Sequence, residues 1–145
     1  KSLGFRVMGV MSVSQALKNS CIPKGSETSF IVVEAGADRV DFLVHDPLSA
    51  PAHYQGDPAS HAVISNLNRI YIDWYDEHKE KIHHVIFSGE RATDHEFLEY
   101  VSRELKLSIH RVNVFANLDL DPSIVPIMTR QESYKYAVAM GLALG

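Results

Sequence analysis

One short stretch combines a glycine with polar and charged residues in a pattern typical of ligand-binding turns. The segment "FSGERATDHEFLEYV" (87–101) indicates the end of a strand, a turn and then a helix. Turns of this kind often carry several glycines where they hold a nucleotide, because bare backbone admits close approach. Here one glycine, Gly89, stands between Ser88 and the charged residues Glu90 and Arg91. The charged residues Glu90 and Arg91 could form a surface ion pair, worth on the order of 0–1 kcal/mol, or could contact a partner protein.

A second candidate is the acid Glu34, at the end of the apolar run "TSFIVVEAG" (28–36). Ligands of α/β sheets bind beyond the strand ends, so this carboxylate is a candidate to hold a metal–water shell. The alternative is a solvated acid with no function. A nuclease would need further carboxylates around paired metals. Asp73 and Asp76 lie near the far end of the predicted helix 58–81, away from Glu34, and a nuclease is therefore not expected.

The histidines and the cysteine do not predict further chemistry. The neighbours His83 and His84 point to opposite sides of a strand and cannot share an ion. No cysteine or carboxylate stands at ligand spacing beside them, and for the pair His53 and His61 we likewise expect no metal site. Cys21 lies near a predicted helix end with no base beside it, which is not the setting of a catalytic thiol. We therefore expect no catalytic residues.

Composition limits the class of protein. The 145 residues suit one domain, and 46% hydrophobic and 22% charged residues are typical of a soluble globular protein. The net charge of -4 and the absence of a dense basic stretch argue against nucleic-acid binding. One cysteine excludes an internal disulfide and fits a reducing compartment. No apolar run is long enough to span a membrane. The chain starts at Lys1 without a methionine, and we expect a piece of a longer chain.

The hydrophobic pattern predicts a regular succession of elements. Strands are expected at 3–11, 28–36, 39–46, 50–57, 83–89 and 108–115, and helices at 12–20, 58–81, 94–107 and 130–145. The helix starts are expected from capping residues: Ser12 with Gln15, Asp57 before Pro58, Thr93 with Glu96, and Thr129 with Glu132.

This order predicts an α/β fold. Three strands in a meander, followed by helix–strand–helix–strand–helix, describe a mixed β-sheet with helices on both faces. That arrangement is ribonuclease-H-like, and actin-like ATPases use it once in each lobe. We expect a single lobe over residues 1–145, the C-terminal part of a longer protein.

Several short motifs in this order resemble the second lobe of PilM-type type IV pilus assembly proteins. The resemblance covers nearly the whole chain but only half of such a protein, and the GspL family of type II secretion is similar as well. The segments that carry it are Asn68-Arg69, Asp73-Trp74-Tyr75, Phe87-Ser88-Gly89, Asn113-Val114-Phe115 and the ending "YAVAMGLALG".

The resemblance implies a nucleotide site that is degenerate here. The family's second phosphate loop resembles D-x-G-x-x-x-T/S. This chain has Glu34, Gly36 and Asp38 there, with no hydroxyl after them. The adenosine turn resembles S-G-G-G-A, where this chain has charged residues in place of two glycines. The subdomain normally inserted before the long helix is reduced to "GDPAS". The implied vestigial site comprises Glu34, Gly36, Asp38, Ser88, Gly89, Glu90 and Arg91.

By resemblance, the chain is expected to be a non-catalytic scaffold in the cytoplasm, peripheral to the inner membrane. Its partners would be inner-membrane assembly proteins and a motor ATPase, with no cofactor or with weakly bound Mg-ATP. The alternative is a working ATP-binding protein whose nucleotide state switches assembly. A third possibility is a one-lobe domain whose exposed face is covered by a partner or by self-association.

Overall fold

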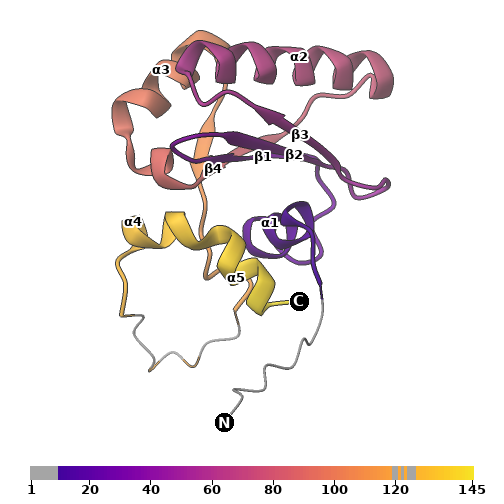
Figure 1. Ribbon diagram of the computed structural model, residues 1–145. Coiled ribbons are helices and arrows are strands. Elements are labelled where there is room, and N and C mark those ends of the chain that lie inside the picture. The colour runs from indigo at the N-terminus through magenta and orange to yellow at the C-terminus, as the bar shows by residue number, and fades with distance from the viewer. Residues whose placement is uncertain (1–9, 119–120, 122, 124–126) are drawn as a thin grey trace.

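The computed structural model describes residues 10–118, 121, 123 and 127–145. Most of the strand predicted at 3–11 lies outside these residues, and the described end of it, residues 10 and 11, is not a strand. The described residues form a central sheet with helices on both sides (Figure 1).

The sheet has five strands in the order β3-β2-β1-β4-β5. The antiparallel meander consists of β1 (Phe30–Ala35), β2 (Val40–His45) and β3 (Ala52–Gly56). The strands β4 (His84–Ser88) and β5 (Ile109–Arg111) add in parallel to β1. The predicted meander and mixed sheet are therefore confirmed, and β3 is an edge strand. The last strand is shorter than the expected 108–115.

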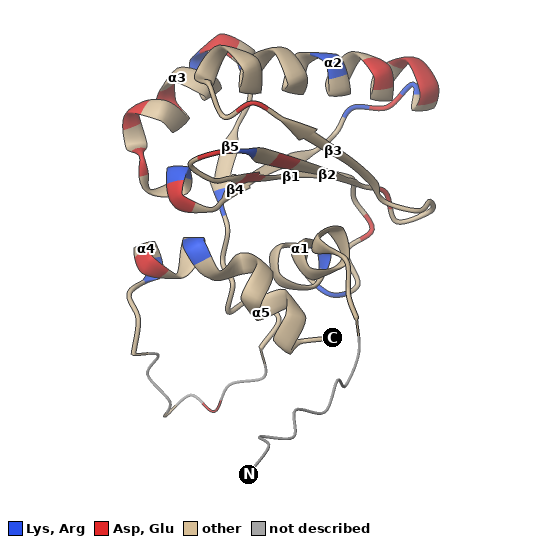
Figure 2. Ribbon diagram, in the orientation of Figure 1, with Lys and Arg blue, Asp and Glu red and all other residues tan. Residues whose placement is uncertain are grey.

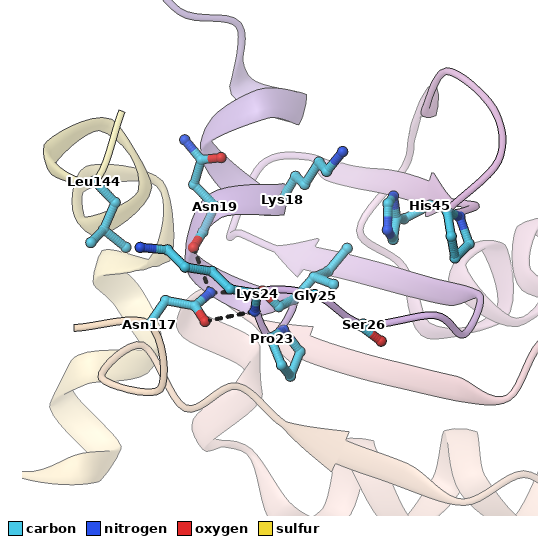
Figure 3. A pocket seen from close by; sticks show the side chains of 11 residues that line it. Lys18, Asn19, Pro23, Lys24, Gly25, Ser26, His45, Asn117 and Leu144 are labelled. Atoms are coloured by element: carbon cyan, nitrogen blue, oxygen red, sulfur yellow. Dashed lines mark hydrogen bonds between the residues drawn. The ribbon is translucent and has the colours of Figure 1, made fainter. Parts of the chain in front are cut away.

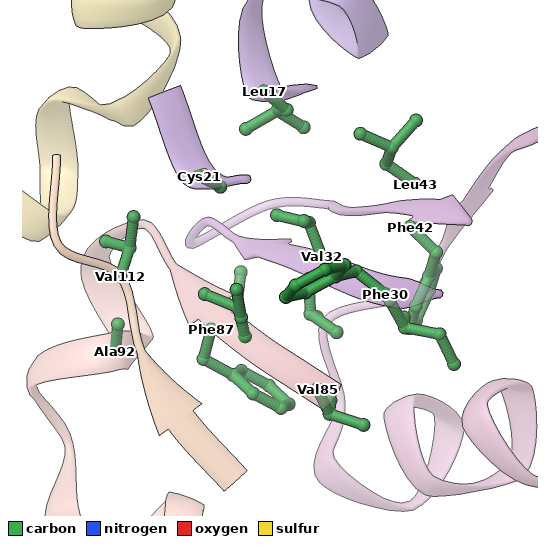
Figure 4. Packing of buried hydrophobic residues seen from close by; sticks show 14 of the residues in the cluster. Leu17, Cys21, Phe30, Val32, Phe42, Leu43, Val85, Phe87, Ala92 and Val112 are labelled. Carbon is green, nitrogen blue, oxygen red and sulfur yellow. The ribbon is translucent and has the colours of Figure 1, made fainter. Parts of the chain in front are cut away.

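Two helical layers cover the sheet. On one face lie α2 (Ser60–His78) and α3 (His95–Leu105), and on the other lie α1 (Val13–Cys21) and α5 (Ala137–Ala143) (Figure 1). The core fills both interfaces, as expected for strands with continuous apolar runs. In Figure 4, Leu43 faces Leu17 of α1 while its neighbour Phe42 points to the opposite side of the sheet. No helix among the described residues combines the length and apolarity needed to cross a membrane.

Two of the predicted helix starts are confirmed. The backbone N–H of Gln15 donates to Ser12 Oγ at 3.2 Å, although the Gln15 side chain donates to Asn19 rather than back to the cap. Thr129 and Glu132 form a complete capping box. The helix that follows is divided into α4 (Arg130–Ser133), the 3₁₀ turn η2 (Tyr134–Tyr136) and α5, whereas one continuous helix over 130–145 was expected.

The other two predicted starts are wrong. Asp57 does not cap α2: its carboxylate accepts from the Ala59 N–H at 2.7 Å, and Ala59 is the cap residue, without a side-chain bond. Pro58 consequently lies before the helix. Asp94, not Thr93, caps α3, because its carboxylate accepts from the Phe97 N–H. Thr93 instead belongs to a 3₁₀ helix, η1 (Glu90–Thr93), and its hydroxyl donates to the Glu90 carbonyl at 2.8 Å.

The long helix α2 presents part of the predicted apolar face to the sheet. Val63, Leu67 and Ile70 are buried, and the Tyr71 hydroxyl donates to the Ile82 carbonyl at 3.1 Å. Tyr75, one turn after Tyr71, is half exposed. The packing is therefore tightest in the first half of α2.

Candidate functional site

The parallel pair β1 and β4 brings two of the predicted site residues together. The strands end at the same edge of the sheet, where Glu34 stands opposite Ser88. The Ser88 hydroxyl donates a short hydrogen bond to the Glu34 carboxylate. Because Ser88 itself is fully buried, this contact lies inside the protein rather than at its surface. The two predicted turns are thus neighbours in space, as a shared site requires.

Burial governs the protonation of Glu34. Loss of hydration raises the pKa of its carboxyl to about 7. The Ser88 hydrogen bond and the Arg39 charge act in the opposite direction, while the Asp41 charge adds to the rise. Protonated and ionised forms are therefore both populated near neutral pH. A metal–water shell needs the ionised form, which this environment does not favour.

Gly89 has a structural reason to be glycine. Its backbone has φ +85° and ψ -175°, a region that residues with a side chain avoid. A Cβ at this position would lie 2.6 Å from the Ala35 carbonyl oxygen at the end of β1. The Gly89 N–H donates to the Tyr134 carbonyl at 2.8 Å, so this donor is already used within the fold.

Arg91 joins the turn to the start of α2. Its guanidinium donates to the Pro58 carbonyl and, at 3.1 Å, to Ser60 Oγ. It also lies over the Phe97 ring, 3.5 Å from the ring centroid. The interpretation of Arg91 as half of a surface pair with Glu90 is therefore wrong. Glu90 is exposed and begins η1, away from these contacts.

The turn after β1 is less specialised. The Gly36 N–H donates to the Arg39 carbonyl at 3.1 Å, closing a tight connection to β2. Gly36 does not adopt a positive φ. Asp38 is exposed at the tip of the turn. Beside Glu34 lies a cavity of about 300 Å³, lined from the turn after β1, from β2 and from the helices α1 and α5: Val13, Glu34, Gly36, Arg39, Asp41 and Val138.

Sequence reasoning missed Asp41, which stands opposite Glu34 on β2. It is 2% exposed, and its carboxylate lies 3.1 Å from Arg39 Nε and 3.0 Å from His53 Nε2. The Gln55 side chain donates to it at 3.0 Å. The signal available in the sequence was an acid, Asp41, between the apolar residues Val40 and Phe42. These contacts make Asp41 a fully engaged carboxylate rather than a free ligand.

The remaining titratable residues do not form a second centre at this edge. Cys21 is buried at the end of α1, and burial raises the pKa of its thiol to about 12, so the thiol stays protonated. Within the described ranges, no group of three or more histidine, cysteine or acidic residues is placed to hold a metal ion. Figure 2 shows acidic residues towards the C-terminal end of α2 and basic residues scattered among the elements.

Comparisons with known proteins point to one family. The family model "Type IV pilus assembly protein PilM" matches residues 57–145. A solved structure of a "PilM-PilN type IV pilus biogenesis complex" is similar in fold, with a TM-score of 0.66 at 14% sequence identity. That match covers 91% of this chain and 50% of the other, so the chain spans about half the length of its structural neighbour. No curated protein matches. Because the family model covers more than half of the sequence, this chain belongs to the PilM family of type IV pilus assembly proteins.

Proposed function

We propose that the chain is a non-catalytic docking lobe of a pilus assembly platform, with a nucleotide site that no longer binds ATP. The lobe would have the ribonuclease-H-like arrangement of actin-like ATPases. The strand order β3-β2-β1-β4-β5, with only β2 antiparallel to both of its neighbours, supports this assignment. The lobe would act in the cytoplasm at the inner membrane, with an inner-membrane partner of the PilN type and a motor ATPase.

The contacts of Arg91 carry the proposal. An adenosine turn needs open space between its glycines and the segment that precedes the long helix. In this chain, the Arg91 guanidinium occupies that space: it binds the Pro58 carbonyl and Ser60 and lies on the Phe97 ring. A purine would have to displace two hydrogen bonds and a cation–π contact. Such contacts are together worth roughly 1–3 kcal/mol, which directly opposes nucleotide binding.

Two further observations support the same proposal. The Gly89 N–H, which a phosphate or base would need, is bound to the Tyr134 carbonyl. Glu34 has a pKa of about 7, so it carries a full negative charge only above neutral pH. The site therefore offers neither a free backbone donor at Gly89 nor a reliably ionised acid at neutral pH.

The alternative is an ATP-dependent switch, which the pairing of Glu34 with Ser88 favours. These residues meet at one edge of the sheet, next to Gly89, in an arrangement that could receive phosphates. In that case nucleotide binding would rotate Arg91 away from α2. It would also lower the pKa of Glu34, because a bound cation stabilises the carboxylate.

Calorimetric titration of Mg-ATP into the native protein separates the two functions. The full-length protein is needed, because this chain spans half of its structural neighbour. We expect no binding heat up to millimolar ATP, and unchanged binding of the cytoplasmic segment of a PilN-type partner with or without ATP. Micromolar ATP affinity, or partner binding that depends on ATP, would establish the switch. Arg91→Ala provides a second readout, since gained ATP affinity would identify the guanidinium as the main obstacle.

A further inference from the structure

A second pocket lies at the other end of the strands, away from the end that carries Glu34. It has a volume of about 350 Å³, within the range of small-molecule sites. Its walls are the end of α1, the loop 22–26 and His45, the last residue of β2 (Figure 3). His45 pairs with Phe30 at the start of β1, whereas Glu34 lies near the end of that strand. The two sites are thus separated by most of the length of β1, roughly 13 Å at the usual rise per residue.

The pocket is positively charged in a chain that is negative overall. Lys18 and Lys24 line it, and none of the described residues in its lining carries a carboxylate. The chain as a whole has a formal net charge of -4. In Figure 3 the Lys18 side chain extends on the His45 side of the pocket, and the Lys24 ammonium lies on the Leu144 side. Desolvated walls strengthen the attraction of such charges for an anion.

His45 supplies an unused polar group at this pocket. The residue is 5% exposed, and its Nδ1 is buried without a hydrogen-bond partner among the described residues. Leaving such a group unpaired costs about 1–3 kcal/mol. Burial, then the Lys18 charge, lowers the pKa of the imidazole, while Asp46 opposes this. A neutral imidazole can present an N–H at Nδ1 to an anionic oxygen.

The pocket wall is held in place by Asn117. Its side-chain amide donates to the carbonyls of Asn19 and Ile22, each at 2.7 Å, and accepts from the Lys24 N–H at 3.1 Å. Figure 3 shows these bonds tying the end of α1 to the following loop. The lysine-bearing segment is therefore preorganised, which reduces the entropy lost when a ligand binds.

We propose that this pocket binds a small organic phosphate, with the phosphoryl group between Lys18 and His45. A phosphate monoester carries close to two negative charges at neutral pH. Lys18 would pair with this charge directly, and Lys24, on the Leu144 side, would add to the positive potential of the pocket. The apolar side chains of Ile22, Pro23, Pro47 and Leu144 would hold a short carbon body. The phosphoryl group could belong to a soluble ester or to the glycerophosphate headgroup of an anionic phospholipid. The inference does not depend on whether the opposite edge binds a nucleotide.

The test is an NMR titration of the native protein with glycerol 3-phosphate, following the His45 ring and the Gly25 amide. We expect saturable shifts with the phosphate and none with glycerol at the same concentration. Lys18→Gln should weaken binding about tenfold or more, the usual effect of losing a hydrogen bond to a charged group. Lys135→Gln, at an exposed lysine on η2, is the matched control and should bind as the native protein does.

Vesicles distinguish the two sources of the phosphoryl group. Flotation with phosphatidylcholine vesicles, with and without phosphatidylglycerol, follows the same variants. Binding that requires phosphatidylglycerol and Lys18 assigns the headgroup, and binding of glycerol 3-phosphate alone assigns a soluble ester. The proposal is overturned if glycerol 3-phosphate does not shift His45 up to millimolar concentration and the protein does not float with phosphatidylglycerol vesicles. It is equally overturned if Lys18→Gln binds as tightly as the native protein.

Discussion

Replacing Gly89 by alanine tests whether this glycine serves the fold. The residue has φ +85° and ψ -175°, and an added Cβ would lie 2.6 Å from the Ala35 carbonyl oxygen and 2.8 Å from its carbon. Such backbone strain costs about 1–3 kcal/mol, and forcing a methyl group into packed atoms costs about 1–3 kcal/mol more. Gly89→Ala should therefore lower the free energy of unfolding by about 2–6 kcal/mol.

Gly36→Ala is the matched control, because it changes the other glycine of the predicted site. Gly36 has no positive φ, and its added Cβ would lie 3.2 Å from the Arg39 carbonyl oxygen. Alanine also reduces the entropy of the unfolded chain, which favours folding by about 0.4–1 kcal/mol. The two effects oppose each other, so this variant should stay within about 1 kcal/mol of the native protein.

Urea unfolding followed by far-UV circular dichroism measures both variants without nucleotide. The expected outcome is a large loss for Gly89→Ala and a small change for Gly36→Ala. If Gly89→Ala were as stable as the native protein, the backbone at this position would not need glycine. The retained glycine would then count in favour of a nucleotide role rather than a structural one.

Three further changes follow from the described contacts, each measured by urea unfolding. Arg91→Ala removes two hydrogen bonds and the stack on Phe97, and should lower the free energy of unfolding by about 1–3 kcal/mol. The control Arg103→Ala, at an exposed arginine, should lower it by about 0.5 kcal/mol or less. Equal losses would show that Arg91 does not join the turn to α2. Asn117→Ala leaves three backbone groups unpaired and should lower the free energy of unfolding by about 2–4 kcal/mol. The control Asn113→Ala, at an exposed residue, removes one hydrogen bond and should lower it by less than about 1 kcal/mol. Similar losses for both would show that Asn117 does not hold the loop in place. For Glu34, the folded pKa of about 7 exceeds the ordinary value of 4.5, so its stabilising effect is complete below pH 4.5 and is lost as pH rises through 7. At pH 8, Glu34→Gln should therefore have a free energy of unfolding up to about 3 kcal/mol higher than that of the native protein, and at pH 4 the difference should vanish. A difference that does not depend on pH would show that Glu34 is not desolvated.

The strands and long helices were predictable because their burial is continuous or periodic. The run 28–36 contains β1, and all but one of the six residues of this strand are buried, so hydrophobicity alone located it. Helix starts were harder to predict where two capping residues are adjacent. Thr93 and Asp94 can both cap a helix, and the choice depends on η1, where the Thr93 hydroxyl already donates to the Glu90 carbonyl. That 3₁₀ turn has no clear signal in the sequence.

The candidate site was predictable only in part. The family resemblance placed Glu34 and Ser88 in one site, and the parallel pairing of β1 with β4 brings the two residues together. The role of Arg91 was not predictable, because its partners Pro58 and Ser60 are more than thirty residues away in sequence. A long flexible side chain at a strand end can reach solvent, a partner protein or another element of the same fold. Only the tertiary arrangement decides between these possibilities.

Arg91 and the short connection between β3 and α2 are physically linked. Three residues connect β3 to α2, and this short connection brings the first turn of α2 within reach of Arg91. A longer insertion would separate these segments, and a glycine at position 91 would leave the Pro58 carbonyl and Ser60 without this donor. The shortened connection and the arginine therefore form one structural unit that closes the space beside Phe97. Opening this space would require changes to both, because either change alone leaves the turn unsupported or the space filled.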